Sequence, residues 1–273
     1  MELWIFIFVT GILVFCLIIL LVILFLQNKR KNNNKNNVDY FDKIIHDLKT
    51  PIYAIEGFAL LTTKSLDQPK KAEEYLGKIQ NVSRHMLSLV KDILDISKIN
   101  DGKLEIHNAI GDLNDILNCC LDTIEPQMIQ RKIHFQKNFH FIHNKVIVDD
   151  LHLNQILTNI LSNAIKYTEK EGSIIFTIFE KQKTEESSTY IFKIQDTGYG
   201  MSEEFQQHIF EPFAQEHTLA HTDVESSGLG LFIVKRLLEL MGGAIEVDSK
   251  LNEGSCFTIQ LDLDFIEKKN SEK

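Results

Sequence analysis

Between residues 72 and 96, apolar side chains recur at alternating steps of three and four without a slip. The residues on this seam are Ala72, Tyr75, Ile79, Val82, Met86, Leu89, Ile93 and Ile96. Such a repeat is typical of a helix whose apolar stripe packs against other helices. Four more apolar residues widen the stripe: Leu76, Leu87, Val90 and Leu94. This width exceeds that of a two-stranded coil and favours a four-helix bundle built from two helical hairpins, so we expect a homodimer.

A second apolar stripe precedes the seam and supplies the other helix of the hairpin. Its residues are Phe41, Ile45, Leu48, Ile52, Ile55 and Ala59. Pro51 lies inside this stripe and predicts a kink, and Pro69 marks the turn between the two helices. We expect residues 39–101 to form this dimeric helical domain, with the first helix beginning near Asp39.

Residues 3–26 contain no charged side chain, and as a helix they would extend about 36 Å, enough to cross a bilayer. The run lacks the preceding basic segment of a cleaved signal peptide. Basic residues follow it directly: Lys29, Arg30, Lys31 and Lys35. The positive-inside rule then predicts a single-pass transmembrane helix, residues 1–27, in the cell membrane. The N-terminus would lie outside, with only two residues there, and the rest of the chain would be cytoplasmic.

Charge is distributed unevenly along the chain. Residues 1–40 hold four basic and two acidic residues, a net charge of +2, so the remainder carries −11 against a total of −9. An acidic body of this kind is repelled by a phosphate backbone, which argues against nucleic-acid binding. Residues 28–38 are rich in Lys and Asn without apolar periodicity, as in a flexible linker. The four cysteines lack a zinc-binding spacing and indicate a reduced cytosolic protein.

After Gly102 the pattern becomes a mixture of helical and strand periodicities. Helices are expected over residues 113–131, 151–167 and 229–241. Short strands are expected near Ile133 and Val146, and over residues 173–179, 190–195, 244–248 and 255–263. Grouped elements of this kind indicate an α/β sandwich. We expect it to occupy residues 109–266 and to be followed by a tail, residues 267–273.

His46 lies about 140° from the centre of the first apolar stripe, and Thr50 lies one turn further on nearly the same face. Both side chains are therefore expected to face water. A water-exposed imidazole is largely neutral at pH 7, so one ring nitrogen keeps a lone pair that can attack phosphorus. Asp47 could hold the proton on the other nitrogen. Alone, this pattern also fits an ordinary surface histidine.

The expected helix over residues 151–167 has a polar face. Asn159, Asn163 and Lys166 lie within about 60° of one another, opposite its apolar residues. Two asparagines one turn apart are less expected on a purely structural surface, because asparagine is a mediocre helix former. Amide oxygens can complete the octahedral shell of Mg²⁺, and a lysine can contact phosphate. A solvated face remains the alternative.

Two glycine-rich segments follow. Asp196 ends an expected strand, and Gly198 and Gly200 allow a sharp turn after it. The carboxylate could accept the amino group of adenine. Gly228 and Gly230 open an expected helix, whose free N–H groups would form a phosphate cradle. Either segment alone is also compatible with an ordinary turn.

Residues 212–227 separate these two segments and are polar and without periodicity, as in a mobile lid. His217 and His221 have an i, i+4 spacing that could bind a metal, but no third ligand is evident. We interpret them as solvated loop histidines. The pair His140 and His143 is interpreted in the same way.

The first helix contains a run that resembles the H-box of bacterial sensor histidine kinases, the sensors of two-component systems: His46-Asp47-Leu48-Lys49-Thr50-Pro51. Four later segments are similar, in order and spacing, to the N, G1, F and G2 boxes of the ATPase domain of that family. They are residues 159–167, 196–200, 210–213 and 228–231. The resemblance covers residues 39–265 and implies a phosphoacceptor hairpin followed by an α/β sandwich of the histidine kinase ATPase type.

The resemblance implies a role for each matching residue. His46 would be the phosphoacceptor, Asp47 the acid or base beside it, and Thr50 the residue that positions water for dephosphorylation of the partner. Asn163 would ligate Mg²⁺, with Asn159 beside it. The other matching residues would bind ATP: Lys166, Tyr167, Asp196, Gly198, Gly200, Phe210, Gly228, Leu229 and Gly230.

Three residues depart from the pattern of the family. Glu225 and Ser226 stand where glycine is common, which concerns the mobility of the lid. His152 replaces a usual arginine upstream of the N box, which concerns the affinity for nucleotide.

The implied activity is autophosphorylation of His46 from Mg-ATP and transfer of the phosphoryl group to an aspartate in the receiver domain of a response regulator on a separate chain. Reverse phosphatase activity is compatible with the same H-box. Residues 100–111, between the two domains, would act as a hinge. Two alternatives stay open: a catalytically weak, membrane-tethered dimeric scaffold of the same fold, and an ATPase of the related chaperone or topoisomerase group. The second ranks last because those proteins lack an H-box on a dimeric hairpin.

Overall fold

The computed structural model describes residues 36–216 and 227–266, with side chains from residue 43 onward. The chain divides after Lys91 into two compact units. The expected membrane anchor, the first part of the linker, the centre of the lid and the tail lie outside the described residues. Over the residues that the structure does describe, no helix is both long enough and apolar enough to cross a membrane.

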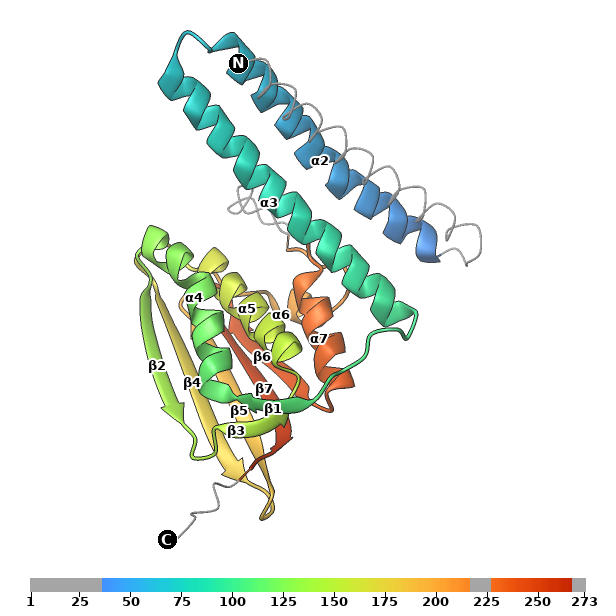
Figure 1. Ribbon diagram of the computed structural model, residues 1–273, viewed down its shortest axis with the longest axis vertical. Helices are drawn as coiled ribbons and strands as arrows, with labels where there is room; N and C mark the ends of the chain where they lie inside the picture. Colours follow the sequence, from blue (N-terminus) through green and yellow to red (C-terminus); the bar gives the residue numbers. More distant parts are fainter. Residues whose placement is uncertain (1–35, 217–226, 267–273) are drawn as a thin grey trace. The chain divides into compact units, whose positions relative to one another are not determined.

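Two long helices form an antiparallel hairpin (Figure 1): α2, Asn36–Lys64, and α3, Pro69–Asn100. α2 begins at Asn36 rather than near residue 39 and continues through Pro51, whose side chain is buried. Backbone hydrogen bonds donated by Ser65 and Gln68 close the turn between the helices. The predicted hairpin is confirmed.

Burial on α3 follows the predicted seam, whereas on α2 the buried residues are Ile44, Leu48 and Pro51, of which only Leu48 belongs to the predicted stripe. Buried residues of the seam are Ile79, Met86, Leu89, Ile93 and Ile96. Phe58 of α2 stacks on Tyr75 of α3 with 6.3 Å between ring centroids, and the Lys78 ammonium lies 5.6 Å from both rings. Three of the four residues that widen the stripe, Leu76, Leu87 and Leu94, remain exposed, and Val90 is half-buried. The apolar stripe is therefore wider than the area that one hairpin buries.

A two-layer α/β sandwich follows, in which three helices cover one face of a five-stranded sheet (Figure 1). The helices are α4, Leu113–Arg131, α5, Asp150–Tyr167, and α7, Gly230–Leu240. The strands of the sheet are β2, His134–His140, β4, Ser173–Gln182, β5, Ser187–Asp196, β6, Ala244–Lys250, and β7, Gly254–Asp264. They lie in the order β2-β4-β5-β7-β6, and only the β2-β4 pair is parallel.

The sandwich confirms the expected architecture, and its three long helices lie close to their predicted bounds. Two strands pair outside the main sheet: β1, Ala109–Asp112, and β3, Lys145–Val148. β1 and the one-turn helix α6, Glu203–Gln206, were not predicted. β1 and α6 hold too few alternations or turns to produce a clear periodic signal.

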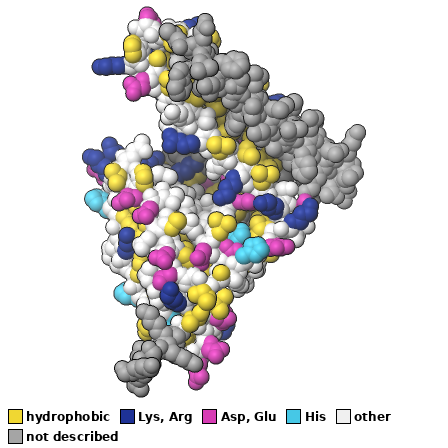
Figure 2. Space-filling model, in the orientation of Figure 1, with side chains coloured by type: hydrophobic (Ala, Val, Ile, Leu, Met, Phe, Trp, Pro, Cys, Tyr) yellow, Lys and Arg dark blue, Asp and Glu magenta, His cyan; other side chains and the backbone are white. Residues whose placement is uncertain are grey.

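Apolar packing against the sheet orients α5. Its buried residues are Leu153, Ile156, Leu157, Ile160, Leu161, Ala164 and Ile165. In the strands beneath, alternate side chains are buried, among them Phe176 of β4 and Phe192 of β5. Acidic and basic side chains are interspersed over the face of this unit that Figure 2 shows.

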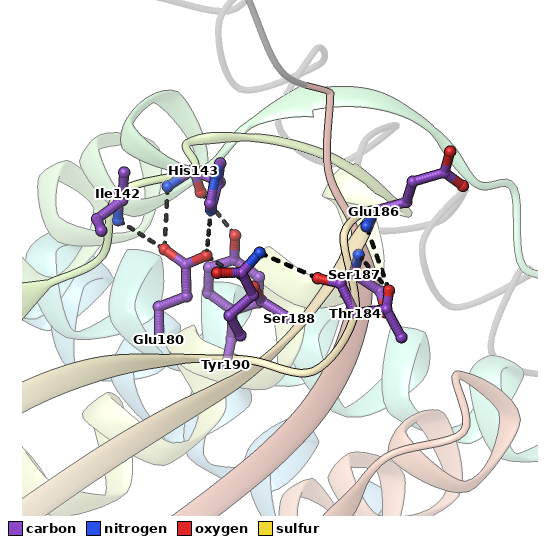
Figure 3. A network of polar contacts seen from close by, with 9 residues as sticks. Ile142, His143, Glu180, Thr184, Glu186, Ser187, Ser188 and Tyr190 are labelled. Atoms are coloured by element: carbon purple, nitrogen blue, oxygen red, sulfur yellow. Dashed lines mark hydrogen bonds and ion pairs between the residues drawn. The ribbon is translucent and has the colours of Figure 1, made fainter.

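A buried polar network lies at the end of the β4-β5 hairpin (Figure 3). The Glu180 carboxylate accepts hydrogen bonds from the backbone N–H groups of Ile142 (2.6 Å) and His143 (2.9 Å). It also accepts one from the Ser188 hydroxyl (2.8 Å) and lies 2.5 Å from Nδ1 of His143. The network therefore attaches the loop after β2 to both strands of the hairpin.

His143 is not the solvated loop histidine that its spacing suggested. Only 18% of its side chain is exposed, its ring stacks on Phe265 with 3.7 Å between centroids, and its carbonyl accepts the Tyr190 hydroxyl at 2.7 Å. Its partners are distant in the sequence, so the local pattern could not reveal them. His140 is exposed, as expected, and stacks on Phe179.

Burial by itself raises the pKa of the Glu180 carboxyl, but the hydrogen bonds from His143, Ile142 and Ser188 outweigh burial and lower the pKa from 4.5 to about 2. The ionised carboxylate is therefore the form that the folded state prefers. Such a group stabilises the fold fully above its unfolded pKa of 4.5, and this contribution is lost as the pH falls through about 2.

Glu180→Gln should lower the free energy of unfolding of the sandwich by about 2–3 kcal/mol at pH 7. The NH2 group of the glutamine side chain would face the backbone N–H groups of Ile142 and His143, so that donors would meet donors. The difference from wild type should shrink between pH 4.5 and about 2. Urea unfolding of the purified chain at several pH values measures it. Glu185→Gln, at an exposed position of the same hairpin, is the control and should change stability by less than about 0.5 kcal/mol. Equal effects of the two substitutions would contradict the stabilising role of the network.

Candidate functional site

His46 faces water on α2, with 80% of its side chain exposed, and Thr50, one turn later, is exposed as well. The predicted exposure of both residues is confirmed. Asp47 places Oδ1 3.5 Å from Nδ1 of His46, at the long end of hydrogen-bond distances. From there the carboxylate can hold a proton on Nδ1, so that Nε2 carries the lone pair.

The polar face of α5 lies where the sequence places it, but its residues are half-buried rather than freely exposed. Asn159, Asn163, Lys166 and Tyr167 all have intermediate exposure. The reason is that α7 packs against α5, and a Cβ atom on Gly230 would lie 3.9 Å from the amide carbon of Asn159. The first residue of α7 and the asparagine face of α5 therefore line the same site.

Asp196 ends β5 and is 5% exposed. Its Oδ1 accepts the N–H groups of Gly198 (2.8 Å) and Ser255 (3.2 Å). Burial raises the pKa of this carboxyl to about 6, against the opposing effect of those two hydrogen bonds. In the described part of the chain both hydrogen bonds reach Oδ1, so Oδ2 is the oxygen suited to accept a ligand donor.

The glycines after β5 allow backbone segments to approach closely. A Cβ atom on Gly198 would lie 2.5 Å from the Tyr167 carbonyl oxygen, and one on Gly200, at φ +64°, would lie 1.9 Å from the Lys250 carbonyl oxygen. The Tyr199 N–H donates to the Tyr167 carbonyl at 3.2 Å. The turn after Asp196 is thus attached to the end of α5.

The segment before α7 is joined to residues 210–213. Gly228 adopts φ +65°, and its carbonyl accepts the N–H of the buried Phe213 at 2.9 Å. Leu229, the N-cap of α7, is buried and provides no side-chain cap, so the first N–H groups of the helix are not capped by it. Phe210 is half-buried, with the Lys235 ammonium of α7 5.6 Å from its ring centroid.

His152 pairs with Asp149 at the start of α5, with 2.8 Å between Nδ1 and Oδ2. Oδ1 of Asp149 caps the helix by accepting the His152 N–H at 3.0 Å. Oδ2 also accepts the N–H of His107 at 2.7 Å. His107, within the predicted hinge, is therefore attached to the start of the same helix that carries the asparagines.

Several predicted features lie outside the described residues, namely His217, His221, Glu225 and Ser226. Within residues 36–216 and 227–266, no three His, Cys, Asp or Glu side chains converge as a metal site. The oxygens available to a cation at the α5 face are instead amide oxygens.

Two residues that shape the site were not predicted. Asp149 carried a usable signal, since an aspartate directly before an apolar-periodic helix is a typical N-cap. Arg131, at the end of α4, donates hydrogen bonds to backbone carbonyls 34–37 residues later. No local pattern marks such a contact.

Two family models match the chain. The His Kinase A (phospho-acceptor) domain matches residues 37–102. The histidine kinase-, DNA gyrase B- and HSP90-like ATPase matches residues 148–264. The chain belongs to the histidine kinases. The first match contains the exposed His46, and the second contains the nucleotide boxes.

Curated relatives are named as a sensor protein and as a sensor kinase/phosphatase. The sensor protein GacS of Pseudomonas syringae pv. syringae is 37% identical over 226 residues, which are 82% of this chain and 25% of that protein. The autoinducer 2 sensor kinase/phosphatase LuxQ of Vibrio vulnificus is 34% identical over 233 residues, 83% of this chain and 26% of that protein. The chain thus corresponds to about a quarter of the length of these relatives.

Solved structures share the fold. The histidine kinase AdeS of Acinetobacter baumannii superposes with a TM-score of 0.59 at 22% identity, over 79% of this chain and 96% of that chain. Histidine kinase ThkA, solved in complex with the response regulator protein TrrA, gives 0.60 at 19% identity, over 90% and 68%. ShkA in complex with AMPPNP gives 0.60 at 24% identity, over 78% and 47%.

Gly200→Ala should destabilise the ATPase domain by more than about 2 kcal/mol, because the new methyl group meets the Lys250 carbonyl and the residue has a positive φ. Gly242→Ala is the matched control, since Gly242 also has a positive φ but nothing lies within 4 Å of a Cβ atom there. It should cost only about 1 kcal/mol. Thermal unfolding measures both, and equal losses would show that backbone conformation alone accounts for the effect.

Proposed function

We propose that the chain is an ATP-dependent protein histidine kinase of the EC 2.7.13.3 type. It would phosphorylate its own His46 and pass the phosphoryl group to an aspartate of a response regulator receiver domain on a separate chain. The observation that carries the proposal is a water-exposed imidazole paired with a carboxylate, in a chain whose second domain brings four nucleotide boxes together at one site.

In the transfer step, the lone pair on Nε2 of His46 attacks the γ-phosphorus of ATP. A nitrogen–phosphorus bond forms, the bond from the γ-phosphorus to the bridging oxygen breaks, and ADP leaves with that electron pair. Asp47 keeps its place beside Nδ1 and stabilises the positive charge that develops on the ring. Further transfer moves the phosphoryl group from His46 to the carboxylate of the receiver domain.

The ATP site fits the chemistry of its residues. Oδ2 of Asp196 would accept the adenine amino group, Tyr167 would line the purine, and Lys166 would contact phosphate. The backbone N–H groups of Gly228 and Gly230 would bind the triphosphate at the start of α7. The Leu229 N–H, which donates to the Ser227 hydroxyl at 3.3 Å, would join them by exchanging that partner for phosphate.

Mg²⁺ fits the same site. The amide oxygen of Asn163, with that of Asn159 beside it, is the hard oxygen donor that this ion prefers, and the phosphates would supply the negative charge. When bound, the ion would neutralise charge on the transferring phosphoryl group.

The hairpin is proposed to dimerise. Leu76, Leu87 and Leu94 leave an apolar stripe exposed along α3, and a second hairpin would bury it as a four-helix bundle. Residues 101–106 would serve as the joint that lets the ATPase domain approach His46, because His107 is already attached to Asp149. Thr50, on the same face as His46, would position water when the protein acts as a phosphatase.

We also propose that residues 1–27 anchor the protein in the cell membrane, with the N-terminus outside and the catalytic part in the cytoplasm. Supporting this are the uncharged run over residues 3–26 and the basic residues directly after it. Treating membranes with alkaline carbonate tests the anchor. The chain should remain in the membrane pellet.

His46→Gln should abolish incorporation of acid-labile phosphate from γ-labelled ATP, because the amide has no nucleophilic ring nitrogen. His107→Gln is the control, since it removes another histidine whose side chain is 79% exposed. It should retain the activity of wild type. If wild type took up no label yet bound a response regulator tightly, the scaffold alternative would stand instead.

Asp196→Asn should weaken ATP binding by about 10- to 100-fold, the loss expected for a hydrogen bond to a charged group. In wild type the affinity should fall as the pH drops through about 6, because protonation removes the carboxylate acceptor. Asp196→Asn should lack this loss of affinity near pH 6. The pH dependence that remains in the variant measures the titration of the ATP phosphates. Asp262→Asn, at an exposed position of β7, should behave as wild type. Identical profiles for wild type and Asp196→Asn would refute the adenine contact.

A further inference from the structure

The carbonyl groups at the end of α5 are all hydrogen-bonded, although the helix supplies a donor for only one of them. The Ala164 carbonyl accepts the Thr168 N–H at 3.0 Å and its hydroxyl at 2.6 Å. The Tyr167 carbonyl accepts the Tyr199 N–H at 3.2 Å. The carbonyls of Ile165, Lys166 and Thr168 have no donor within the helix, as is usual at a helix C-terminus.

Arg131 contacts all three through Nη1, whose two N–H groups are shared among the three acceptors. Its Nη1 lies 2.8 Å from the Ile165 carbonyl oxygen, 2.7 Å from that of Lys166 and 2.9 Å from that of Thr168. The side chain is half-buried, and its positive charge faces the negative end of the α5 dipole. Its own carbonyl accepts the Glu171 N–H at 3.1 Å, so the segment around it is attached to the turn after α5 as well.

We propose that Arg131 is a positioning residue for ATP. It fixes the position of the C-terminal end of α5, from which Lys166 and Tyr167 reach the nucleotide. The inference rests on the proposed function and names a residue that lies outside the five boxes. Arg131 acts through the backbone and does not touch the ligand.

A second set of contacts holds the same end of α5 from the side of the adenine-binding turn. The turn that follows Asp196 meets α5 at the Tyr167 carbonyl, through the Tyr199 N–H and the close approach of Gly198. The end of α5 is therefore held between Arg131 and the adenine-binding turn. Loss of the arginine would let the helix end shift, and a shift of about 1 Å is enough to disturb a positioned ligand.

The test compares Arg131→Met, Arg131→Lys and wild type in autophosphorylation at increasing ATP concentration, with thermal unfolding of each variant. Arg131→Met should raise KM for ATP about tenfold while the rate at saturating ATP stays within about twofold. Arg131→Lys keeps the charge but has a shorter reach, so its KM should lie about threefold above wild type. Arg236→Met, at a half-buried arginine paired with Glu239 on α7, is the matched control and should keep the KM of wild type.

The outcomes separate the two proposals. A wild-type chain that neither binds ATP nor incorporates phosphate overturns the proposed function and this inference with it. An active wild type together with an unchanged KM in Arg131→Met overturns the inference alone, even if the variant unfolds at a lower temperature. Should Arg131→Met fail to fold, Arg131→Lys decides: a raised KM supports positioning, and a wild-type KM shows a structural role only.

Discussion

The burial of one face of α5 is the constraint on which the nucleotide site depends. Seven apolar side chains of this helix pack against the sheet, and they fix its rotation about its own axis. Asn159, Asn163 and Lys166 must then lie away from these apolar residues, and Asn159 lies beside Gly230 at the start of α7. An error of one residue in this packing would bury the asparagines, so the hydrophobic core and the positions of the site residues have the same physical origin.

Close backbone contacts complete the site around that helix. Gly198 and Gly228 lie where a Cβ atom would meet backbone within 3 Å, so the turn after β5 and the segment before α7 can reach α5 and residues 210–213. Asp196 is buried at the start of the turn after β5, and its pKa is raised to about 6 because burial disfavours the ionised form. A ligand that donates a hydrogen bond to this carboxylate would offset that cost, which would link the proposed recognition of adenine to the burial of Asp196.

The hairpin and the ATPase domain contribute different things to the proposed reaction. The hairpin keeps the imidazole of His46 in water, and it leaves an apolar stripe that a single copy does not bury. The ATPase domain carries the proposed nucleotide residues on a five-stranded sheet and the helices that cover it. Their link between Asp101 and Ile106 has no regular secondary structure, whereas His107 is attached to Asp149 at the start of α5.

Periodicity in the sequence determined the hairpin, the three long helices and the exposure of His46, because each follows from a repeat within one segment. The order of short motifs predicted which residues would bind the nucleotide. Only the tertiary structure decided that His143 is buried against Glu180, that Asp149 holds His107, and that Arg131 holds the end of α5. Each of these joins residues more than thirty positions apart, and the free energy of such a contact depends on burial and on donor geometry. Neither quantity exists until the chain has folded.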